Sequence, residues 1–452
     1  MINELSFAGG AGRRIRIPPE MDVPVTPRVA KLIDTAAMRR LSRVSQLGLV
    51  HLVYPGATHS RLEHSLGVYR NALLTLGALL SGPVPPGITI RHQSAEAFIV
   101  AALLHDLGHW PFCHPIEDMG LVGVIRHEHR IEDWLDVGGF ATLIKRDWCC
   151  TIPDVLSLLT EKWSQKCGLS EQEIVFFRSC LSGPVDIDKM DYLVRDSVHA
   201  GVPYGRNFDV ARLVAAMAVD PGCLRVAITE KGRTAAELMV VARYVMFSEV
   251  YWHHAVRSAT AMLQRAVFEI RDRIDLNSMA ALDDSSWVRS FIDASEATKI
   301  PAVKKIVDGL FGSRRMLYKR VAEFSVSRGL DIHYRLAHRP YHWLAKCADN
   351  LAAVLKDVSG KKVLPGEVII DSPPVKLEVD INVSIIQRDG TVQKLANVSP
   401  VAESLAHQQF DGHVKKVRIF ISPELRELSA SFLKKDEGLI FEAIKMTEAQ
   451  FV

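Results

Sequence analysis

The sequence predicts a mainly α-helical protein, with a large helical core and a smaller C-terminal α+β lobe. Apolar residues recur at helical spacing through most of residues 28–355, whereas residues 367–393 and 414–422 alternate as β-strands do. The chain has 452 residues, of which 48% are apolar and 24% charged. This length exceeds one typical hydrophobic core, so two or three subdomains are expected.

The expected elements follow in chain order. Residues 1–27 are rich in Gly, Pro and Arg and are expected to be irregular. The core is expected over residues 28–215, with helices from Pro27 to about Leu47, at 60–80, at 94–107 and within 130–215, and with loops near Gly138-Gly139 and Gly183-Pro184.

A second region, residues 216–355, is expected to complete the core. It should begin with a β-hairpin at 224–238 that turns at Lys231-Gly232, continue as one helix over 239–270, and remain helical to about Leu355. Residues 356–452 are expected to form the C-terminal lobe. Asp389-Gly390 is predicted as a hairpin turn, 414–422 as a strand, and a helix should follow Pro423.

The composition gives no support to several classes of protein. The formal net charge is +3, too small to indicate a nucleic-acid-binding protein or one that binds an anionic membrane. No apolar run approaches the roughly 18–20 residues of a membrane span, and the N-terminus has no apolar signal core. The seven cysteines are scattered without a CxxC pair, so neither a zinc knuckle nor a disulfide framework is indicated. A cytoplasmic location is expected.

Four residues suggest a metal centre: His64, His105, Asp106 and Asp188. Ser60 and Glu63 form a capping-box pattern that places His64 on the first turns of a helix. His105 falls on the buried face of the next helix, near its end. Two imidazoles and two carboxylates suit Mn, Fe, Co, Ni or Zn, with Mg as a further candidate. Such a metal can polarise a phosphoryl oxygen and generate hydroxide.

Several longer stretches carry a family resemblance. They are QLGLVHLVYPGATHSRLEHSLGV (46–68), HDLGHWPFCH (105–114), RHEH (126–129), DIDKMDYLVRDSVHAGV (186–202) and ARYVMFSEVYWHHAVR (242–257). In order and spacing they resemble the HD-domain phosphohydrolases. More narrowly, they resemble the deoxynucleoside triphosphate triphosphohydrolases, which include bacterial members and a vertebrate enzyme with a sterile-alpha-motif domain.

The resemblance implies a role for each matching residue. It implies that His64, His105, Asp106 and Asp188 bind the metal and that Arg61, Lys189 and Arg243 contact the triphosphate. It also implies two acid–base pairs, His109 with Glu117 and His127 with Glu128, and places His114 near the substrate. Gln46 and Asp196 would recognise the sugar 3′-hydroxyl, and Tyr192 and Tyr251 would wall the sugar.

Helical spacing agrees with part of this assignment. Lys189, Tyr192 and Asp196 are spaced i, i+3, i+7, so they share one helix face that begins at Asp188. A polyphosphate needs several cations, and this face and the arginines supply them. Asp186 and Asp191, which flank Asp188, are interpreted as ordinary turn and helix-surface carboxylates.

The resemblance further implies a homo-oligomer, dimeric or tetrameric, and an allosteric nucleotide as a candidate ligand. Asp34 and Arg40 keep the pattern of the activator site, but Ser42 stands where an arginine that binds the activator is expected. Activation by a guanine nucleotide is therefore not expected.

The leading hypothesis is hydrolysis of deoxynucleoside triphosphates (dNTPs) to deoxynucleoside and inorganic triphosphate. Two alternatives stay open. One is an HD-type phosphohydrolase that acts on a monophosphate, a cyclic nucleotide or RNA. The other is an effector that senses nucleotides or binds nucleic acid with little catalysis. The complete set of metal ligands argues against the effector, since a pure binding module does not need all four.

Overall fold

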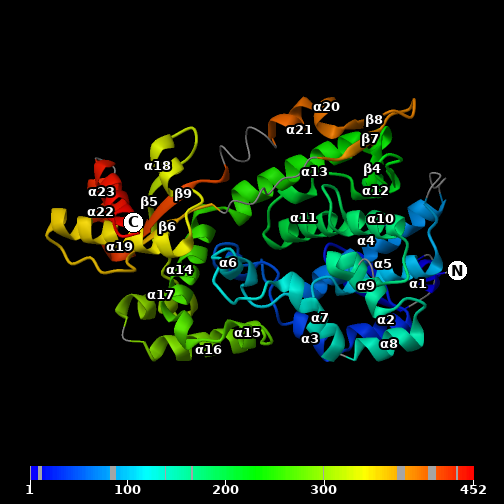
Figure 1. Cartoon of the computed structure of the whole chain (residues 1–452), viewed down its shortest axis with the longest axis horizontal. Helices are drawn as coiled ribbons and strands as arrows, with labels where there is room; N and C mark the ends of the chain where they lie inside the picture. Colours follow the sequence, from blue (N-terminus) through cyan, green and yellow to red (C-terminus); the bar gives the residue numbers. More distant parts are fainter. Residues whose placement is uncertain are drawn as a thin grey trace.

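A computed structural model describes residues 2–8, 13–81, 88–137, 139–163, 166–298, 300–373, 382–405, 414–433 and 436–451. It is mainly helical with a C-terminal α+β part, which confirms the predicted fold class. The N-terminal half lies on the right of Figure 1 and the C-terminal lobe on the left; helix α13 (Arg233–Met246) runs along the N-terminal half, and helix α14 (His254–Ile270) packs against the lobe.

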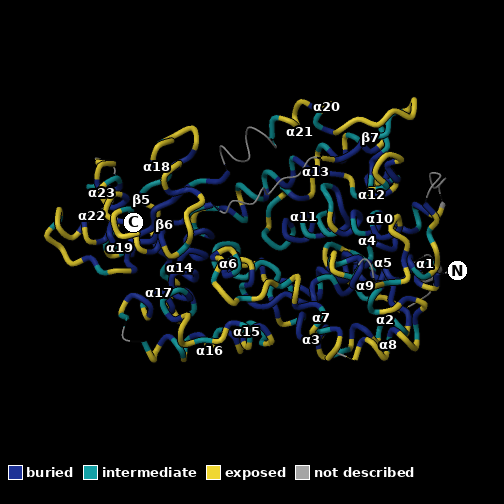
Figure 2. Tube along the Cα trace, in the orientation of Figure 1, coloured by how far each residue is buried: buried dark blue, intermediate teal, exposed yellow. Residues whose placement is uncertain are grey.

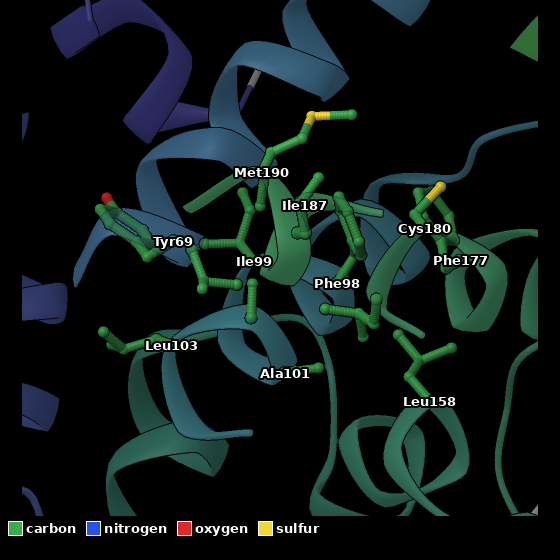
Figure 3. Packing of buried hydrophobic residues seen from close by; sticks show 14 of the residues in the cluster. Tyr69, Phe98, Ile99, Ala101, Leu103, Leu158, Phe177, Cys180, Ile187 and Met190 are labelled. Atoms are coloured by element: carbon green, nitrogen blue, oxygen red, sulfur yellow. The ribbon is translucent and has the colours of Figure 1, made fainter. Parts of the chain in front are cut away.

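Three helices form the centre of the N-terminal half: α4 (Arg61–Ser81), α5 (His92–Leu104) and α11 (Ile187–His199). Most of their residues are buried (Figure 2), and α5 is buried throughout from Ser94 to Leu104. A helix that is apolar on all sides belongs inside a core. Phe98 stacks on Phe177 at a centroid distance of 4.8 Å, and Met190 of α11 lies in the same packed cluster (Figure 3). This packing holds the C-terminal end of α5, where His105 follows.

The N-terminal segment has regular structure, so the prediction of an irregular 1–27 is wrong. It contains helix α1 (Asn3–Ala8) and an antiparallel hairpin of β1 (Arg14–Ile17) and β2 (Met21–Pro24). The buried Glu4 accepts hydrogen bonds from Thr26 and Arg28, each at 2.8 Å. These contacts come from residues more than twenty positions away, and local composition does not reveal them.

Shorter helices surround the central three. The helix predicted from Pro27 to Leu47 is divided, because Thr35 caps a new helix and accepts a hydrogen bond from the backbone N–H of Met38. The surrounding elements are α2 (Pro27–Ile33), α3 (Ala36–Leu41), η1 (Gly48–Leu52), α6 (Cys113–Glu117), α7 (His127–Val137), α8 (Phe140–Asp147), α9 (Ile152–Leu159), η2 (Glu161–Trp163), α10 (Glu171–Leu181), η3 (Tyr204–Arg206) and α12 (Val210–Ala215).

The hairpin predicted at 224–238 is wrong in its second strand. Strand β4 (Val226–Thr229) pairs instead with the preceding β3 (Met217–Val219), and the chain enters α13 through the 3₁₀ turn η4 (Glu230–Gly232). Residues 233–238 are helical because their apolar positions continue the helical repeat of α13. The buried residues of that face are Ala235, Ala236, Met239, Val240, Ala242 and Met246.

The single helix predicted over 239–270 is interrupted. Helix α13 ends at Met246, one π-helical turn η5 (Phe247–Tyr251) follows, and α14 begins at His254. Single π-helical turns are common at functional sites. This one carries Tyr251 to the wall of the central cavity.

The region from residue 271 to residue 359 is mostly helical in its described residues. Its helices are η6 (Arg271–Arg273), α15 (Leu276–Met279), α16 (Asp284–Glu296), α17 (Pro301–Phe311), α18 (Leu330–Leu336) and α19 (Tyr341–Ser359). Strand β5 (Lys319–Phe324) corrects the prediction that helix continues to Leu355. Its partner, β9 (Val417–Ile421), lies far along the chain, so the local sequence does not predict the pairing.

The C-terminal lobe is a three-stranded sheet covered by helices. The antiparallel order is β5-β9-β6, where β6 spans Val368–Asp371. Helix α19 packs on β6 and on α23 (Gly438–Glu448), and α22 (Arg426–Leu433) packs on β5 after the 3₁₀ turn η8 (Pro423–Leu425). The strand predicted at 414–422 and the helix after Pro423 are confirmed.

One part of the expected C-terminal lobe returns to the core. Strands β7 (Ser384–Ile386) and β8 (Val392–Lys394) form the hairpin predicted around Asp389-Gly390, and Gly390 has a φ of 84°. Strand β7 pairs in parallel with β4. The following helices, α20 (Leu395–Val398) and α21 (Pro400–Ser404), continue this segment, and α21 packs on α13. Residues 374–381 of the predicted strand run lie outside the described residues.

Over the described residues, no helix has both the length and the apolar character that crossing a membrane requires.

Candidate active site

A cavity of about 970 Å³ opens between the central helices and the α13–α14 junction. Every site residue proposed from the sequence lines this cavity except Glu117, which stands behind His127. The cavity walls come from α4, α6, α7, α11 and α13 and from the turn that follows α5. Elements distant in sequence therefore meet around one cavity.

His64, His105 and Asp188 bring three metal-binding atoms together. The Nε2 atoms of the two histidines are 3.3 Å apart, and Oδ1 of Asp188 lies 2.9 Å from Nε2 of His64 and 3.7 Å from Nε2 of His105. Oδ1 of Asp106 is 3.3 Å from Nε2 of His105. His64 and Asp188 lie on the first turns of α4 and α11, and His105 and Asp106 directly follow α5. This donor set fits one divalent metal ion.

Each imidazole has its second nitrogen held by a protein oxygen. Nδ1 of His64 lies 2.8 Å from Oδ2 of Asp191, and Nδ1 of His105 lies 3.0 Å from the carbonyl oxygen of Ala102. Both arrangements leave Nε2 free to point at a metal, as the outer partners of metal-binding histidines do. Burial disfavours the charged form of His64, but its hydrogen bonds with Asp188 and Asp191 outweigh burial and raise the pKa to about 10.

The interpretation of Asp191 as a helix-surface carboxylate is wrong. Asp191 is fully buried, and it accepts from His64 and from both Nε and Nη2 of Arg195, at 2.8 and 2.7 Å. Arg195 in turn donates to Glu63 at 2.7 Å. The other flanking carboxylate, Asp186, is also buried and caps α11. The i, i+4 spacing of Asp191 and Arg195 is the sequence signal that could have indicated the buried pair.

Arg61 joins the metal-binding residues to the rest of the cavity. Its Nη1 donates to Oδ2 of Asp106 at 2.9 Å, and its side chain is buried. Burial raises the pKa of Asp106, but the charges of His109, His105 and Arg61 outweigh it and hold the pKa well below its usual range. Arg61 therefore positions a candidate metal-binding carboxylate as well as facing the cavity.

A second group of histidines lies beside this centre. The ring centroids of His109 and His127 are 4.0 Å apart, and that of His114 is 5.1 Å from His109 and 4.9 Å from His127. Burial, with the positive charge of Arg61, holds the pKa of His109 well below its usual value. Burial, with the charge of His127, lowers the pKa of His114 to about 3. His114 is therefore neutral at physiological pH.

The pairing of histidines with carboxylates differs from the expectation. Glu117 does not face His109; its Oε2 lies 2.8 Å from Nδ1 of His127 and its Oε1 accepts from the backbone N–H of His127. Glu128 is half-exposed, 3.7 Å from Nε2 of His127. His109 instead has its Nδ1 3.0 Å from Oδ1 of Asp106. The turn after α6 brings Glu117 back to the start of α7, a closure that sequence spacing does not reveal.

The side of the cavity expected to hold the sugar is built around Asp196. Its carboxylate accepts from the hydroxyl of Tyr251 at 2.6 Å and lies 2.8 Å from Nε2 of His59. The rings of Tyr192 and Tyr251 meet edge to face, with centroids 6.5 Å apart. Oε1 of Gln46 is buried and has no hydrogen-bond partner among the described residues. His59, which the sequence did not single out, holds Asp196 in place.

Two cations lie near the start of α11. Nζ of Lys189 is 2.6 Å from Oδ2 of Asp186. Burial lowers the pKa of this ammonium group, but the charge of Asp186 outweighs burial, so the pKa of Lys189 is raised. Lys189 is therefore charged where it borders the cavity. Arg243 of α13 is buried and lines the same wall.

Arg40, which keeps the activator pattern, has an internal role here. Its guanidinium donates to the carbonyl oxygens of Leu107 and His109, each at 2.8 Å, and lies over the ring of Trp134. It is buried and holds the turn that follows His105 and Asp106. The hydroxyl of Ser42 donates to Arg39 in its own turn.

Comparisons with known proteins place the whole chain among its relatives. Residues 208–428 match a family model described as the HD associated region. The chain is 30% identical over 395 residues to the uncharacterized protein MJ1154 of Methanocaldococcus jannaschii, covering 86% of this chain and 75% of that protein. It is 25% identical over 460 residues to the deoxynucleoside triphosphate triphosphohydrolase SAMHD1 of Danio rerio, covering 94% of this chain and 71% of that protein. The crystal structure of a hypothetical protein from Aquifex aeolicus superposes with a TM-score of 0.69 at 26% identity, covering 93% and 99% of the two chains.

Proposed function

Since this chain belongs to the HD-domain phosphohydrolase family, we propose that it hydrolyses deoxynucleoside triphosphates to deoxynucleoside and inorganic triphosphate. The observation that carries the proposal is the make-up of one cavity. A set of residues able to bind a divalent metal, buried cations and hydroxyl-binding groups all face the same volume. A monophosphate would not require cations at both Arg61 and Lys189.

The reaction we propose is attack of water at the α-phosphorus. The bond between the α-phosphorus and the sugar 5′-oxygen breaks. The deoxynucleoside leaves with its 5′-oxygen, and the oxygen of water becomes part of the triphosphate. A divalent cation bound by His64, His105, Asp106 and Asp188 would supply Lewis-acid polarisation and acidify water. Arg61, Lys189 and Arg243 would balance the charge of the phosphates.

The leaving 5′-oxygen must gain a proton. We assign this step to His109 or His127, which lie side by side next to the metal-binding residues. His127 has a carboxylate at Nδ1, from Glu117, which fixes its tautomer and leaves Nε2 to exchange the proton. His114 completes the wall beside them.

The sugar would lie against Tyr192, Tyr251, Asp196 and Gln46. The unpartnered Oε1 of Gln46 is available to accept from a 3′-hydroxyl, and a buried acceptor left unpaired would penalise a substrate without that group. The ring of Tyr192 would crowd a ribose 2′-hydroxyl. The name of the Danio rerio relative supports the same substrate class.

The test is a product analysis in ¹⁸O-labelled water. Purified protein with Mn²⁺ is incubated with each of the four dNTPs, separately and mixed, with Asp188→Ala as the inactive control. We expect unlabelled deoxynucleoside and triphosphate carrying one ¹⁸O. Label in a nucleoside monophosphate, or turnover only of monophosphates, cyclic nucleotides or RNA, would contradict the proposal.

The native metal and the assembly are also proposals. The imidazole and carboxylate donors fit Mn, Fe, Co, Ni or Zn, and Mg is the harder alternative. A dimer or tetramer is expected, and light scattering with and without nucleotide measures it. Turnover only in the mixture of dNTPs would indicate a nucleotide activator.

A further inference from the structure

Four side chains next to the proposed metal centre form a second set of metal-binding atoms. They are His109, Cys113, His114 and His127, and one potential ligand atom from each lies within 4.8 Å of all the others. They come from the turn after α5, from α6 and from the first residue of α7. The set contains a thiol and no carboxylate, so its chemistry differs from that of His64, His105 and Asp188.

Two of the three imidazoles have a carboxylate at Nδ1. Oε2 of Glu117 lies 2.8 Å from Nδ1 of His127, and Oδ1 of Asp106 lies 3.0 Å from Nδ1 of His109. A carboxylate at the second nitrogen is the usual support of a metal-binding histidine, because it fixes the tautomer and increases the basicity of the other nitrogen. Glu117 therefore leaves Nε2 of His127 as a ligand atom, whereas the approach of Asp106 to Nδ1 of His109 has no hydrogen-bond geometry.

The donors suit a zinc-like ion. Three imidazoles and one thiolate are a tetrahedral set for zinc, with Zn–S of about 2.3 Å and Zn–N of about 2.0–2.1 Å. Ligand atoms already within 4.8 Å of one another need only modest side-chain rotations to reach that geometry. All four residues line the cavity, so an ion has a path to them although Cys113 is buried. A hard ion such as Mg²⁺ would not choose a thiolate.

We propose that His109, Cys113, His114 and His127 form a second, thiolate-containing site for a zinc-like divalent ion. Binding converts the thiol of Cys113 to a metal-bound thiolate and releases one proton to solvent. A further consequence rests on the proposed function: an ion held at this site occupies His109 and His127, so it inhibits hydrolysis by withdrawing both from proton transfer.

The test is anaerobic titration of the metal-stripped full chain with Co²⁺, a spectroscopic substitute for zinc. We expect two ions per chain and a thiolate-to-cobalt charge-transfer absorption in the near ultraviolet. The Cys113→Ser variant should lose that absorption, and its affinity for the second ion should fall at least about tenfold. The His64→Ala variant should keep the absorption, because it alters only the neighbouring centre.

A second cysteine requires a matched control. Cys149 lies near His92 and Glu96, in another group of potential ligand atoms. Glu96 there is already paired with Arg28 at 2.6 Å, which makes it a poor ligand. The Cys149→Ser variant should therefore keep the absorption. Absence of the absorption in the wild type, or its survival in Cys113→Ser, would overturn the proposal. His114→Ala provides a second variant, and circular dichroism verifies that each variant is folded.

The inhibitory consequence has its own readout. Zinc is added to the Mn²⁺-loaded enzyme during dNTP turnover, and each variant is normalised to its own rate without zinc. We expect the half-inhibitory zinc concentration to rise at least about tenfold in Cys113→Ser and to stay unchanged in Cys149→Ser. Failure of dNTP turnover would refute the proposed function and leave the cobalt result standing. Equal zinc sensitivity of wild type and Cys113→Ser would refute the inhibitory role.

Discussion

The two halves of the cavity contain the same side chain in opposite electrostatic surroundings. At one end, Asp188 and Asp191 flank His64 and raise its pKa to about 10. At the other end, burial and neighbouring positive charge lower the pKa of His114 to about 3. The boundary between the two halves is Asp106, which lies against His105, His109 and Arg61.

The difference shows that the neighbours of an imidazole decide what it can do. A histidine surrounded by carboxylates belongs to a site that attracts a cation, and the carboxylates then share the charge of the metal. A neutral buried histidine offers a lone pair and a proton without drawing a hard cation from water. One cavity can therefore separate metal binding from proton transfer over a few ångströms.

The strongest test of the comparison removes the carboxylate shared by both metal-binding histidines. Asp188→Ala should abolish metal binding at the His64 and His105 centre and reduce dNTP hydrolysis to the background rate, because Oδ1 of Asp188 faces both Nε2 atoms. Metal content by mass spectrometry and kcat are the measurements. The surface variant Asp136→Ala is the control and should match the wild type. Full activity in Asp188→Ala would remove the metal centre from the mechanism.

Substitutions in the histidine group should lower kcat without removing the ion of the His64, His105 and Asp188 centre. His109→Gln or His127→Gln removes a proton donor, and kcat should fall about 10²–10⁴-fold. The ion held by His64, His105 and Asp188 should remain, because neither variant contributes to that donor set. If either variant instead lost this ion, the division of the cavity into two halves would be wrong.

A smaller effect is expected behind the metal centre. Asp191→Asn weakens the hydrogen bond to His64 and removes the negative charge that pairs with the buried Arg195. Metal affinity and activity should fall about 10–100-fold, and the free energy of unfolding should fall by up to about 3–5 kcal/mol. Calorimetric metal titration and urea unfolding measure the two effects. Adding Arg195→Met to this variant should restore part of the stability without restoring metal affinity.

The smallest effects distinguish the two glutamates near His127. Glu117→Gln removes the charge at Nδ1 of His127, and kcat should fall about 10-fold. Glu128→Gln should change kcat less than about 3-fold, because Glu128 is half-exposed and 3.7 Å from the ring. The ratio of the two kcat values is the measurement. A larger loss in Glu128→Gln would restore the pairing that the sequence suggested.

Some elements were predictable because their cause is local. The helical repeat around Phe98 predicted a buried helix that ends near His105, and the turn at Asp389-Gly390 predicted the β7–β8 hairpin. Others have a distant cause. The partner of β5 lies almost one hundred residues away, and β7 joins β4 and leaves the neighbouring lobe. A sequence pattern records which face of an element is apolar, but it does not record which other element covers that face.

The sequence by itself determined the fold class, because helical spacing is a local property, and its motifs carried the family resemblance that implied many of the residues lining the cavity. Only the tertiary structure decided that Asp191 supports His64, that Glu117 faces His127, and that Cys113 joins the histidines. Each of these depends on side chains from different elements approaching within hydrogen-bond or metal-ligand distance. Such distances follow from the packing of whole helices, which no single stretch of sequence specifies.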